Sequence, residues 1–213
     1  MDSFKSAIDF LRDRPDQFVQ LLDAHLRLSI SALLIAVAIF VPMGVLCARW
    51  VTIGSAAVGT ITALRVIPSL ALILLFYPWL GFGYGPALLA LVILAGPPLV
   101  LNTYAGMRGV DASILEAARG IGMNPVQVFF RVQFPLALPV VIAGMRTAAV
   151  EIIASATLAS FVGVRTLGQW ILTGISLLDN TYLLAGALPI MGLVLAAELL
   201  FGGLERLVTP RMA

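Results

Sequence analysis

"EAARGIGMNPVQVFFRVQFP", residues 116–135, separates two long apolar runs of a chain that is otherwise suited to lipid. The stretch holds three charged side chains and, before its final proline, three glycine or proline residues that interrupt a helical pattern. A polar insert tied at both ends to apolar helices is expected to stand outside the bilayer, because charges are costly in hydrocarbon. The stretch therefore predicts a membrane protein with a small projection on one side.

The composition agrees with this assignment. Of the 213 residues, 61% are hydrophobic and 11% are charged, and the mean hydropathy is +1.05. Soluble domains carry about 25% charged residues, so the chain is expected in a bilayer. A net charge of +2 without a basic tract predicts no nucleic-acid partner. The single cysteine, Cys47, excludes an internal disulfide, and we expect no metal or cofactor bound by this chain.

Five membrane-spanning helices are predicted, making the fold an all-α integral membrane protein. A span needs about 20 mostly apolar residues, and the glycine- and proline-containing turn at 81–86 divides the longest apolar run into two spans. The short apolar segment 164–178 is expected to be a re-entrant or surface segment on the outer side. The predicted spans cover residues 28–48, 57–79, 86–106, 135–161 and 180–204.

Residues 1–27 form an amphipathic N-terminal segment, expected to be an interfacial helix lying on the membrane surface. The alternative is a solvated leader without a role. No apolar core follows a basic start, so a signal peptide is not expected. The remaining chain divides into a transmembrane domain, 28–205, and a short cytoplasmic tail, 206–213.

Arginine placement favours a cytoplasmic position for the insert. With residues 1–27 set aside, arginines are concentrated on the side of the insert, as the positive-inside rule requires of cytoplasmic loops. On that side lie Arg49, Arg108, Arg119, Arg131, Arg206 and Arg211, against Arg165 on the other side.

The first half of the insert predicts a short helix. Ser113 and Glu116 have the spacing of a capping box, in which the serine hydroxyl accepts from a first-turn amide and the glutamate reaches back to the serine amide. Ala117 and Ala118 continue the helix. Two glycines follow, and the second, Gly122, is expected to end it.

The second half predicts another helix over residues 125–132. Asn124 is the expected N-cap and Pro125 the first helical residue, and Pro135 then opens the next span. Two short helices joined by a tight glycine turn make a rigid projection that could pass a force from a partner into the spanning helices. An ordinary structured loop is the alternative interpretation.

The insert resembles the EAA loop of bacterial ABC-transporter permeases. That pattern is Glu-Ala-Ala, three residues, Gly, nine residues, then Ile-x-Leu-Pro, and here valine replaces the isoleucine and phenylalanine the leucine. The spacing is kept throughout. The matching positions are Glu116, Ala117, Ala118, Gly122, Val132, Phe134 and Pro135.

The resemblance implies that residues 110–134 form a cytoplasmic coupling-helix loop, which docks into a groove on the ATPase subunit. The residues expected to couple the chain to the ATPase are Ser113, Glu116, Ala117, Ala118, Gly120, Gly122, Asn124 and Pro125.

Three further stretches, residues 67–76, 97–122 and 134–163, look like the permeases of glycine betaine, carnitine and choline importers. The likeness covers about residues 20–205 and implies a type I importer permease in the bacterial inner membrane. Its implied partners are two ATPase subunits that hold ATP and Mg, a second permease subunit, identical or homologous, and an extracytoplasmic solute-binding protein. One loop departs from the family, since "GVRTLG", 163–168, stands where relatives have a glycine-rich sequence.

Other functions remain open at this point. The solute could be an amino acid or another small molecule, and the chain could be a stand-alone secondary carrier or a scaffold. It is not expected to be an enzyme. Its only lysine, Lys5, lies in no P-loop motif, and its only histidine, His25, excludes an H-E-x-x-H zinc site and is expected to be interfacial or at a helix start.

Charges inside the predicted spans need partners, because each costs roughly 2.5–3.5 kcal/mol at mid-span. Arg146 and Glu151 are five residues apart and cannot meet on one helical face, so the leading prediction pairs Arg65 with Glu151. Arg146 is expected to snorkel toward the cytoplasm, and Glu198 to be interfacial. Such pairs hold helices together, or line or gate a path. The candidate path or gate residues are Arg65, Pro68, Arg146, Glu151 and Ser155.

Overall fold

The computed structural model describes residues 2–209, without the side chains of residues 2, 51–53 and 55, and all regular structure in this part of the chain is helical. The elements in chain order are α1 Asp2–Asp13, α2 Pro15–Arg49, α3 Val51–Ala63, the 3-10 helix η1 Leu64–Val66, α4 Ser69–Leu80, α5 Tyr84–Arg108, α6 Ala112–Gly120, α7 Pro125–Val128, the π-helical turn η2 Phe129–Gln133, α8 Phe134–Ser155, the 3-10 helix η3 Ala156–Val162, α9 Gly168–Leu177 and α10 Asn180–Val208.

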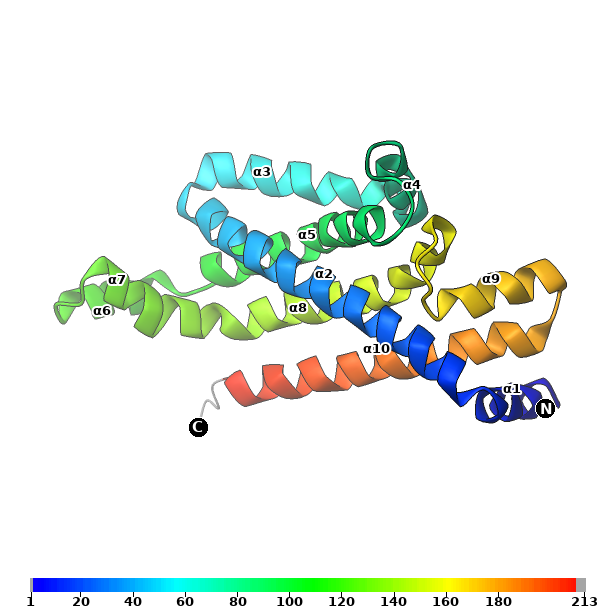
Figure 1. Cartoon of the computed structure of the whole chain (residues 1–213). Coiled ribbons are helices and arrows are strands. Elements are labelled where there is room, and N and C mark those ends of the chain that lie inside the picture. The colour runs from blue at the N-terminus through cyan, green and yellow to red at the C-terminus, as the bar shows by residue number, and fades with distance from the viewer. Residues whose placement is uncertain (1, 210–213) are drawn as a thin grey trace.

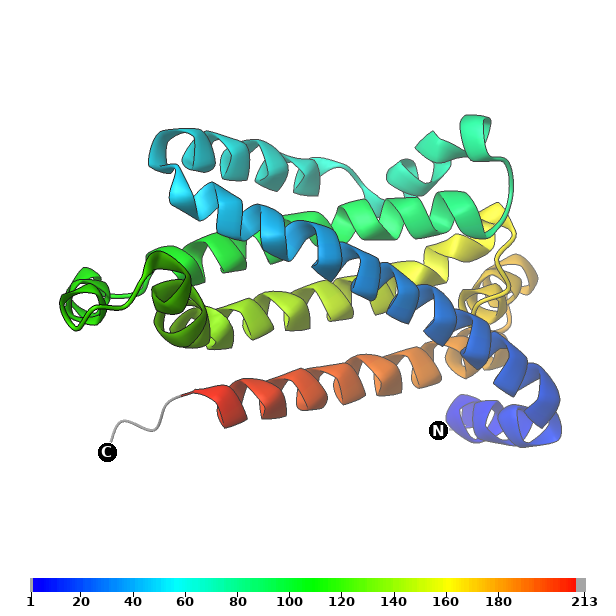
Figure 2. The same cartoon turned by 60° about the vertical axis from the view of Figure 1, so that its left-hand side comes forward.

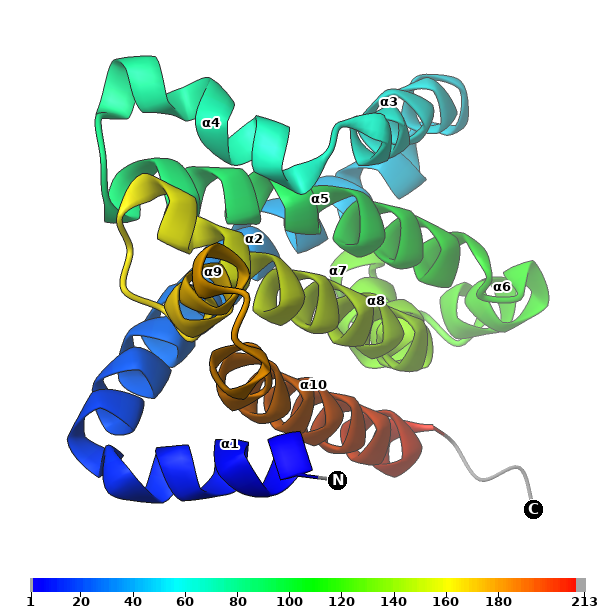
Figure 3. The same cartoon turned by 90° about the vertical axis from the view of Figure 1, so that its right-hand side faces the viewer.

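The long helices run side by side between two ends of the molecule (Figure 1). The α6–α7 region projects at one end, beside the C-terminal end of α10, and a rotated view shows the same projection clear of the bundle (Figure 2). At the opposite end lie α1 and α9, which come to the front in Figure 3. Because α1 and the end of α10 lie at opposite ends (Figure 1), the chain between them runs from one end of the molecule to the other an odd number of times.

Five crossings follow if a bent pair of helices counts as one. Four helical stretches are long and apolar enough to span a membrane, namely Pro15–Arg49, Tyr84–Arg108, Pro125–Val162 and Asn180–Val208. A fifth consists of Ala56–Val66 and Ser69–Leu80, which meet at an angle of 93°. This agrees with the predicted count of five.

The predicted continuous span 57–79 is wrong in one respect, because the helix breaks before Pro68. A proline lacks the amide needed by the preceding turn, and it disfavours helical geometry in the residue before it. Ile67 accordingly adopts an extended conformation, with φ −75° and ψ 121°. The break sets η1 and Arg65 at the elbow of a bent span.

The N-terminal region also differs from prediction. Only α1 is a separate helix, because α2 begins at Pro15, at the first helical position, and continues without interruption through the predicted boundary at residue 27. The ring of Phe10 lies 5.3 Å from that of Trp170 and 4.7 Å from that of Tyr182, measured between centroids. One side of α1 thus packs on α9 and α10. Other apolar residues of α1, such as Phe4, remain exposed.

The core gathers around α5, which packs against α2, α4 and α8. Two glycines let α5 and α8 approach closely, as small residues do in membrane helices. A Cβ on Gly106 would lie 3.0 Å from the carbonyl oxygen of Ala137, and one on Gly144 would lie 3.0 Å from the carbonyl oxygen of Pro98. Gly106 and Gly144 therefore serve the packing of α5 against α8.

Candidate functional site

The projection begins at Asp111, which caps α6. Its carboxylate Oδ1 accepts a hydrogen bond of 2.8 Å from the amide of Ser113. The backbone amide and the side chain of Ser113 both stabilise the ionised form, which holds the pKa of Asp111 below its usual value. The predicted capping box of Ser113 and Glu116 is therefore wrong, because the helix starts one residue before Ser113 and an aspartate has already taken the N-cap.

The end of α6 is the glycine stop that the sequence predicts. Gly122 has φ +87°, in the left-handed region that glycine tolerates best. Its amide donates to the carbonyl of Arg119 at 2.9 Å, and the amide of Met123 donates to the carbonyl of Ala118 at 3.2 Å. These two bonds form a Schellman motif, so α6 is closed by hydrogen bonds at both ends.

Asn124 restarts the helix, as predicted. Its side-chain oxygen accepts from the amide of Gln127, and the Gln127 side chain accepts from the amide of Asn124, both at 2.9 Å. Pro125 occupies the first turn, where its missing amide costs nothing.

The second helix does not stand alone, however, and the predicted start of a span at Pro135 is wrong. α7 continues through η2 into α8 as one helical body from Pro125 to Val162. In η2 the amide of Phe134 donates to the carbonyl of Phe129, one residue further back than in an α-helix. This wider turn directly precedes Pro135, where a regular helix would suffer a clash. The projection therefore consists of one short helix, α6, and the extended end of α8.

Apolar side chains on the projection are left uncovered, a feature that the sequence analysis missed. Ile121 is 78% exposed and Phe130 65% exposed, and Ile114 and Val126 are exposed as well. Exposed apolar groups beside polar ones mark a protein contact surface. The sequence offered one indication of this surface, because these four apolar residues lie in an insert that was predicted to stand outside the bilayer. Of the predicted coupling residues, Glu116 and Ala117 are exposed and Ala118 is buried.

The predicted ion pair between Arg65 and Glu151 is confirmed. Arg65 Nη2 lies 3.3 Å from Glu151 Oε1, which connects the elbow at η1 with α8. Both side chains stay partly exposed, at 42% and 33%. The other carboxylate oxygen of Glu151 is buried and has no hydrogen-bond partner among the described residues. Pro68, which creates the elbow, follows Arg65 by three residues and is the N-cap residue of α4.

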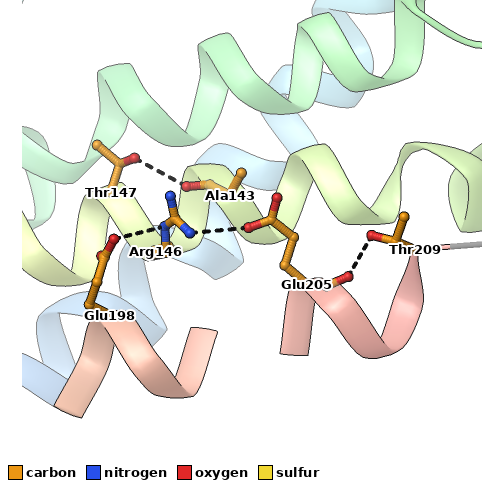
Figure 4. A network of polar contacts seen from close by, with 6 residues as sticks. All are labelled: Ala143, Arg146, Thr147, Glu198, Glu205 and Thr209. Carbon is orange, nitrogen blue, oxygen red and sulfur yellow. Dashed lines mark hydrogen bonds and ion pairs between the residues drawn. The ribbon is translucent and has the colours of Figure 1, made fainter. Parts of the chain in front are cut away.

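Arg146 finds its partners on another helix, because it joins α8 to α10, although the sequence did not identify which glutamates they are. Its Nε lies 3.4 Å from Glu198 Oε1 and its Nη1 3.4 Å from Glu205 Oε2 (Figure 4). The two glutamates are seven residues apart and therefore share one face of α10. Glu198, which was predicted to be interfacial, stays about half exposed while it pairs with Arg146 on α8. Ser155 lies half-buried at the end of α8, where the helix tightens into η3.

His25 is not interfacial, and that prediction is wrong. The side chain is fully buried, and its Nε2–H donates to the backbone carbonyl of Ile153 at 3.1 Å. Because α2 extends past residue 27, the residue faces α8 instead of the membrane surface. Its role is to hold the two helices together.

The unusual loop 163–168 is fixed by Thr166. The buried hydroxyl of Thr166 donates to the carbonyl of Ala156 at 3.1 Å and accepts from the amide of Gly168 at 3.3 Å. Arg165 is exposed at the end of the molecule opposite the projection. The segment after the loop forms α9, which packs against α10 through close contacts at Gly174 and Gly186. The sequence GVRTLG thus forms a hydrogen-bonded turn that carries one exposed cation, Arg165.

Comparison with known proteins places this geometry in a family. Residues 28–213 match the family described as "Binding-protein-dependent transport system inner membrane component". The chain is 40% identical to the carnitine transport permease protein OpuCB of Listeria monocytogenes over 187 residues, covering 88% of this chain and 86% of the relative. It is 36% identical to the choline transport system permease protein OpuBB of Bacillus subtilis over 203 residues, covering 95% and 94%.

Solved structures agree with this fold. An inward-facing form of the MetNI methionine ABC transporter gives a TM-score of 0.80 at 20% identity, covering 93% of this chain and 99% of the other. An amino acid ABC transporter gives 0.69 at the same identity, covering 94% and 95%. At that identity the likeness concerns the fold alone. In this family the permease spans the inner membrane several times, while ATP is hydrolysed by separate subunits and the substrate is delivered by a binding protein. The chain therefore belongs to the binding-protein-dependent transport system inner membrane components, the permease subunits of ABC importers.

Proposed function

We propose that this chain is the permease for a compatible solute of the glycine betaine, choline and carnitine class. The names of its relatives support this, since matches at 35–40% identity are transport permeases for carnitine, for choline, and for glycine betaine, carnitine and choline together. These relatives align over at least 88% of this chain. The structural likeness to methionine and amino-acid transporters is at 20% identity and gives no support to an amino-acid substrate.

The proposed assembly contains two permease subunits, identical or homologous, which together enclose the path. Two ATPase subunits bind the projections from the cytoplasm and carry the ATP and Mg. An external binding protein delivers the solute at the opposite end, near α1, α9 and the loop 163–168. Work done at the ATPases reaches the path as a change of conformation, which is allosteric coupling between separate sites.

The observation that carries this mechanism is the construction of the projection. α6 is held between the Asp111 cap and the Schellman turn at Gly122, so it cannot lengthen or unwind easily when pressed. Beyond the turn, the capping box at Asn124 opens a helix that runs without a break into α8. A displacement of α6 by the ATPase therefore moves α8 as a rigid lever.

We assign the gate to the groups that this lever carries. Glu151 lies on α8 and Arg65 lies on the elbow before Pro68, so a shift of α8 changes their separation. Arg146 links α8 to α10, and Ser155 is the last residue of α8. Partial exposure of Arg65 and Glu151 suits groups that face a path in one state and each other in another.

Uptake by proteoliposomes tests the proposal. The permease is reconstituted with its ATPase and binding protein, and radiolabelled choline, carnitine, glycine betaine and methionine are compared. Uptake of at least one quaternary ammonium solute is expected with ATP and not with a nonhydrolysable analogue. Continued uptake driven by a solute gradient with the analogue contradicts the proposal in favour of a secondary carrier, and methionine uptake alone contradicts the substrate class.

A further inference from the structure

A concave site lies at the end of the molecule that carries the projection. It has a volume of about 370 Å³ and is formed where the ends of α2, α5 and α6 meet α7 and the π-helical turn η2. One part of its wall is apolar and includes Val45, Ala48 and Val128. The other part carries the guanidinium groups of Arg49 and Arg119. The site is therefore amphipathic, with apolar and cationic walls facing the same space.

The cations in this site are uncompensated. No acidic side chain is among the described residues that line the pocket, and neither arginine takes part in the ion pairs found within residues 2–209. Arg49 lies over the ring of Phe129, with 5.8 Å between its Cζ and the ring centroid. That contact orients the guanidinium without using its N–H donors, because a ring face offers no carboxylate or carbonyl acceptor. Two arginines with free donors favour a phosphate group.

The depth of the pocket indicates where that phosphate comes from. Val45 and Ala48 belong to the uncharged run 28–48, which is about as long as the hydrocarbon core is thick. Arg49 is the first charge after it, and the adjacent Trp50 is 59% exposed, as aromatic residues at the membrane–water interface are. The arginines thus stand at headgroup depth while the apolar wall extends toward the acyl region. A small soluble anion would leave that apolar wall uncovered.

We propose that this pocket binds the headgroup of an anionic phospholipid from the adjacent leaflet. The phosphodiester lies between Arg49 and Arg119, and the first methylenes of the lipid cover Val45, Ala48 and Val128. Basic pockets between membrane helices on the cytoplasmic side take anionic lipids in this way. Because the pocket lies between the end of α2 and the helices of the projection, the lipid bridges a spanning helix and the projection.

Fluorescence of Trp50 provides the test, because this residue adjoins the pocket, whereas the other two tryptophans, Trp79 in α4 and Trp170 in α9, lie toward the other end of the molecule (Figure 1). The full chain is reconstituted in vesicles that contain brominated phosphatidylglycerol or brominated phosphatidylcholine. Matched Trp50→Phe variants give the contribution of the other tryptophans, which is subtracted. Phosphatidylglycerol is expected to quench Trp50 more strongly than phosphatidylcholine at equal mole fraction.

Variants assign the preference to the pocket. Each of Arg49→Gln and Arg119→Gln is expected to weaken phosphatidylglycerol binding about fivefold, and Arg49→Lys, which keeps the charge, retains most of it. Arg131→Gln is the matched control, since Arg131 is exposed at the same end but does not line the pocket. All of these side chains are exposed, so the fold is expected to persist.

Three results overturn the proposal. The first is equal quenching by the two lipids, or a preference that survives Arg49→Gln together with Arg119→Gln. The second is loss of the preference on adding inorganic phosphate, which assigns the pocket to a soluble anion. The third is weakened binding of the ATPase by the double variant with lipid preference unchanged, which assigns the pocket to the partner protein.

Discussion

The carboxylate of Glu151 lies 3.3 Å from the guanidinium of Arg65, although 86 positions separate the two residues in sequence. One stands on a continuous helix that begins at the coupling projection, and the other stands on the elbow of a broken span. In the proposed mechanism the pair connects the helix that the ATPase displaces with the bent span that carries Arg65.

Breaking this pair is expected to affect transport more than stability. A partly exposed ion pair contributes about 0–1 kcal/mol, so Glu151→Gln should leave the unfolding temperature in detergent nearly unchanged. Its ATP-driven uptake should fall several-fold, because the gate no longer closes on a charged partner. The exchange variant Arg65→Glu with Glu151→Arg should recover part of the uptake. Equal uptake by Glu151→Gln and the unaltered chain contradicts the gate assignment.

The glycine turn of the projection makes a second prediction. Gly122→Ala places a side chain at φ +87°, where the strain is about 1–2 kcal/mol, although nothing lies within 4 Å of the added Cβ. Backbone strain is therefore the only energetic cost of the substitution. Because this strain disturbs the turn that closes α6, the number of solute molecules taken up per ATP hydrolysed should drop. Gly120→Ala is the matched control, since Gly120 also has open space around it but is helical, and alanine there should be neutral or slightly stabilising. If both variants behave alike, the turn geometry is not what matters.

The cap at Asp111 predicts a dependence on pH. Its pKa is lowered by hydrogen bonds from Ser113, so the cap stabilises α6 above the usual pKa of aspartate and is lost as pH falls through the lowered value. Amide hydrogen exchange in α6 should therefore speed up in acid beyond its intrinsic pH dependence. Asp111→Asn should keep the protection and remove this dependence, because asparagine caps without ionising. An Asn variant that loses protection at neutral pH contradicts the capping role.

Helix packing around α5 makes a prediction about stability. A Cβ on Gly144 would lie 2.7 Å from Asn102 Cβ and 3.0 Å from the carbonyl oxygen of Pro98. Gly144→Ala should destabilise the protein by about 1–3 kcal/mol, as overpacking does, and lower its unfolding temperature in detergent. Gly192→Ala on α10, where nothing lies within 4 Å, should change it little. A Gly144→Ala variant as stable as Gly192→Ala shows that the contact relaxes freely.

Hydropathy, turn residues and charge cost predicted much of this architecture. The count of spans, the glycine stop at Gly122, the cap at Asn124 and the Arg65–Glu151 pair all depend on local chemistry or on the need to pair a charge within a membrane span. Such rules act within a few residues or force a single choice of partner, and so they can be applied to a sequence directly.

The errors share a different cause. A proline has opposite effects depending on context: Pro15 starts a helix, Pro68 breaks a span, and Pro135 is absorbed by a π-helical turn. The burial of His25 and the pairing of Arg146 depend on which helices lie together. That information is tertiary, and a pattern along one helix does not contain it. The pocket at Arg49 and Arg119 combines residues 70 positions apart and likewise needed the structure.

The proposed mechanism requires α6 to press against an ATPase in the cytoplasm, and a single engineered cysteine tests this directly. Cys47 is the only cysteine of the chain, so Cys47→Ala provides a cysteine-free background, and Ala117→Cys then places one thiol on the exposed side of α6. The thiol should cross-link to the ATPase subunit in the assembled complex and should react with a membrane-impermeant maleimide only from the cytoplasmic side of the membrane. Labelling from the external side, or free labelling at an unchanged rate whether or not the ATPase is bound, would contradict the account.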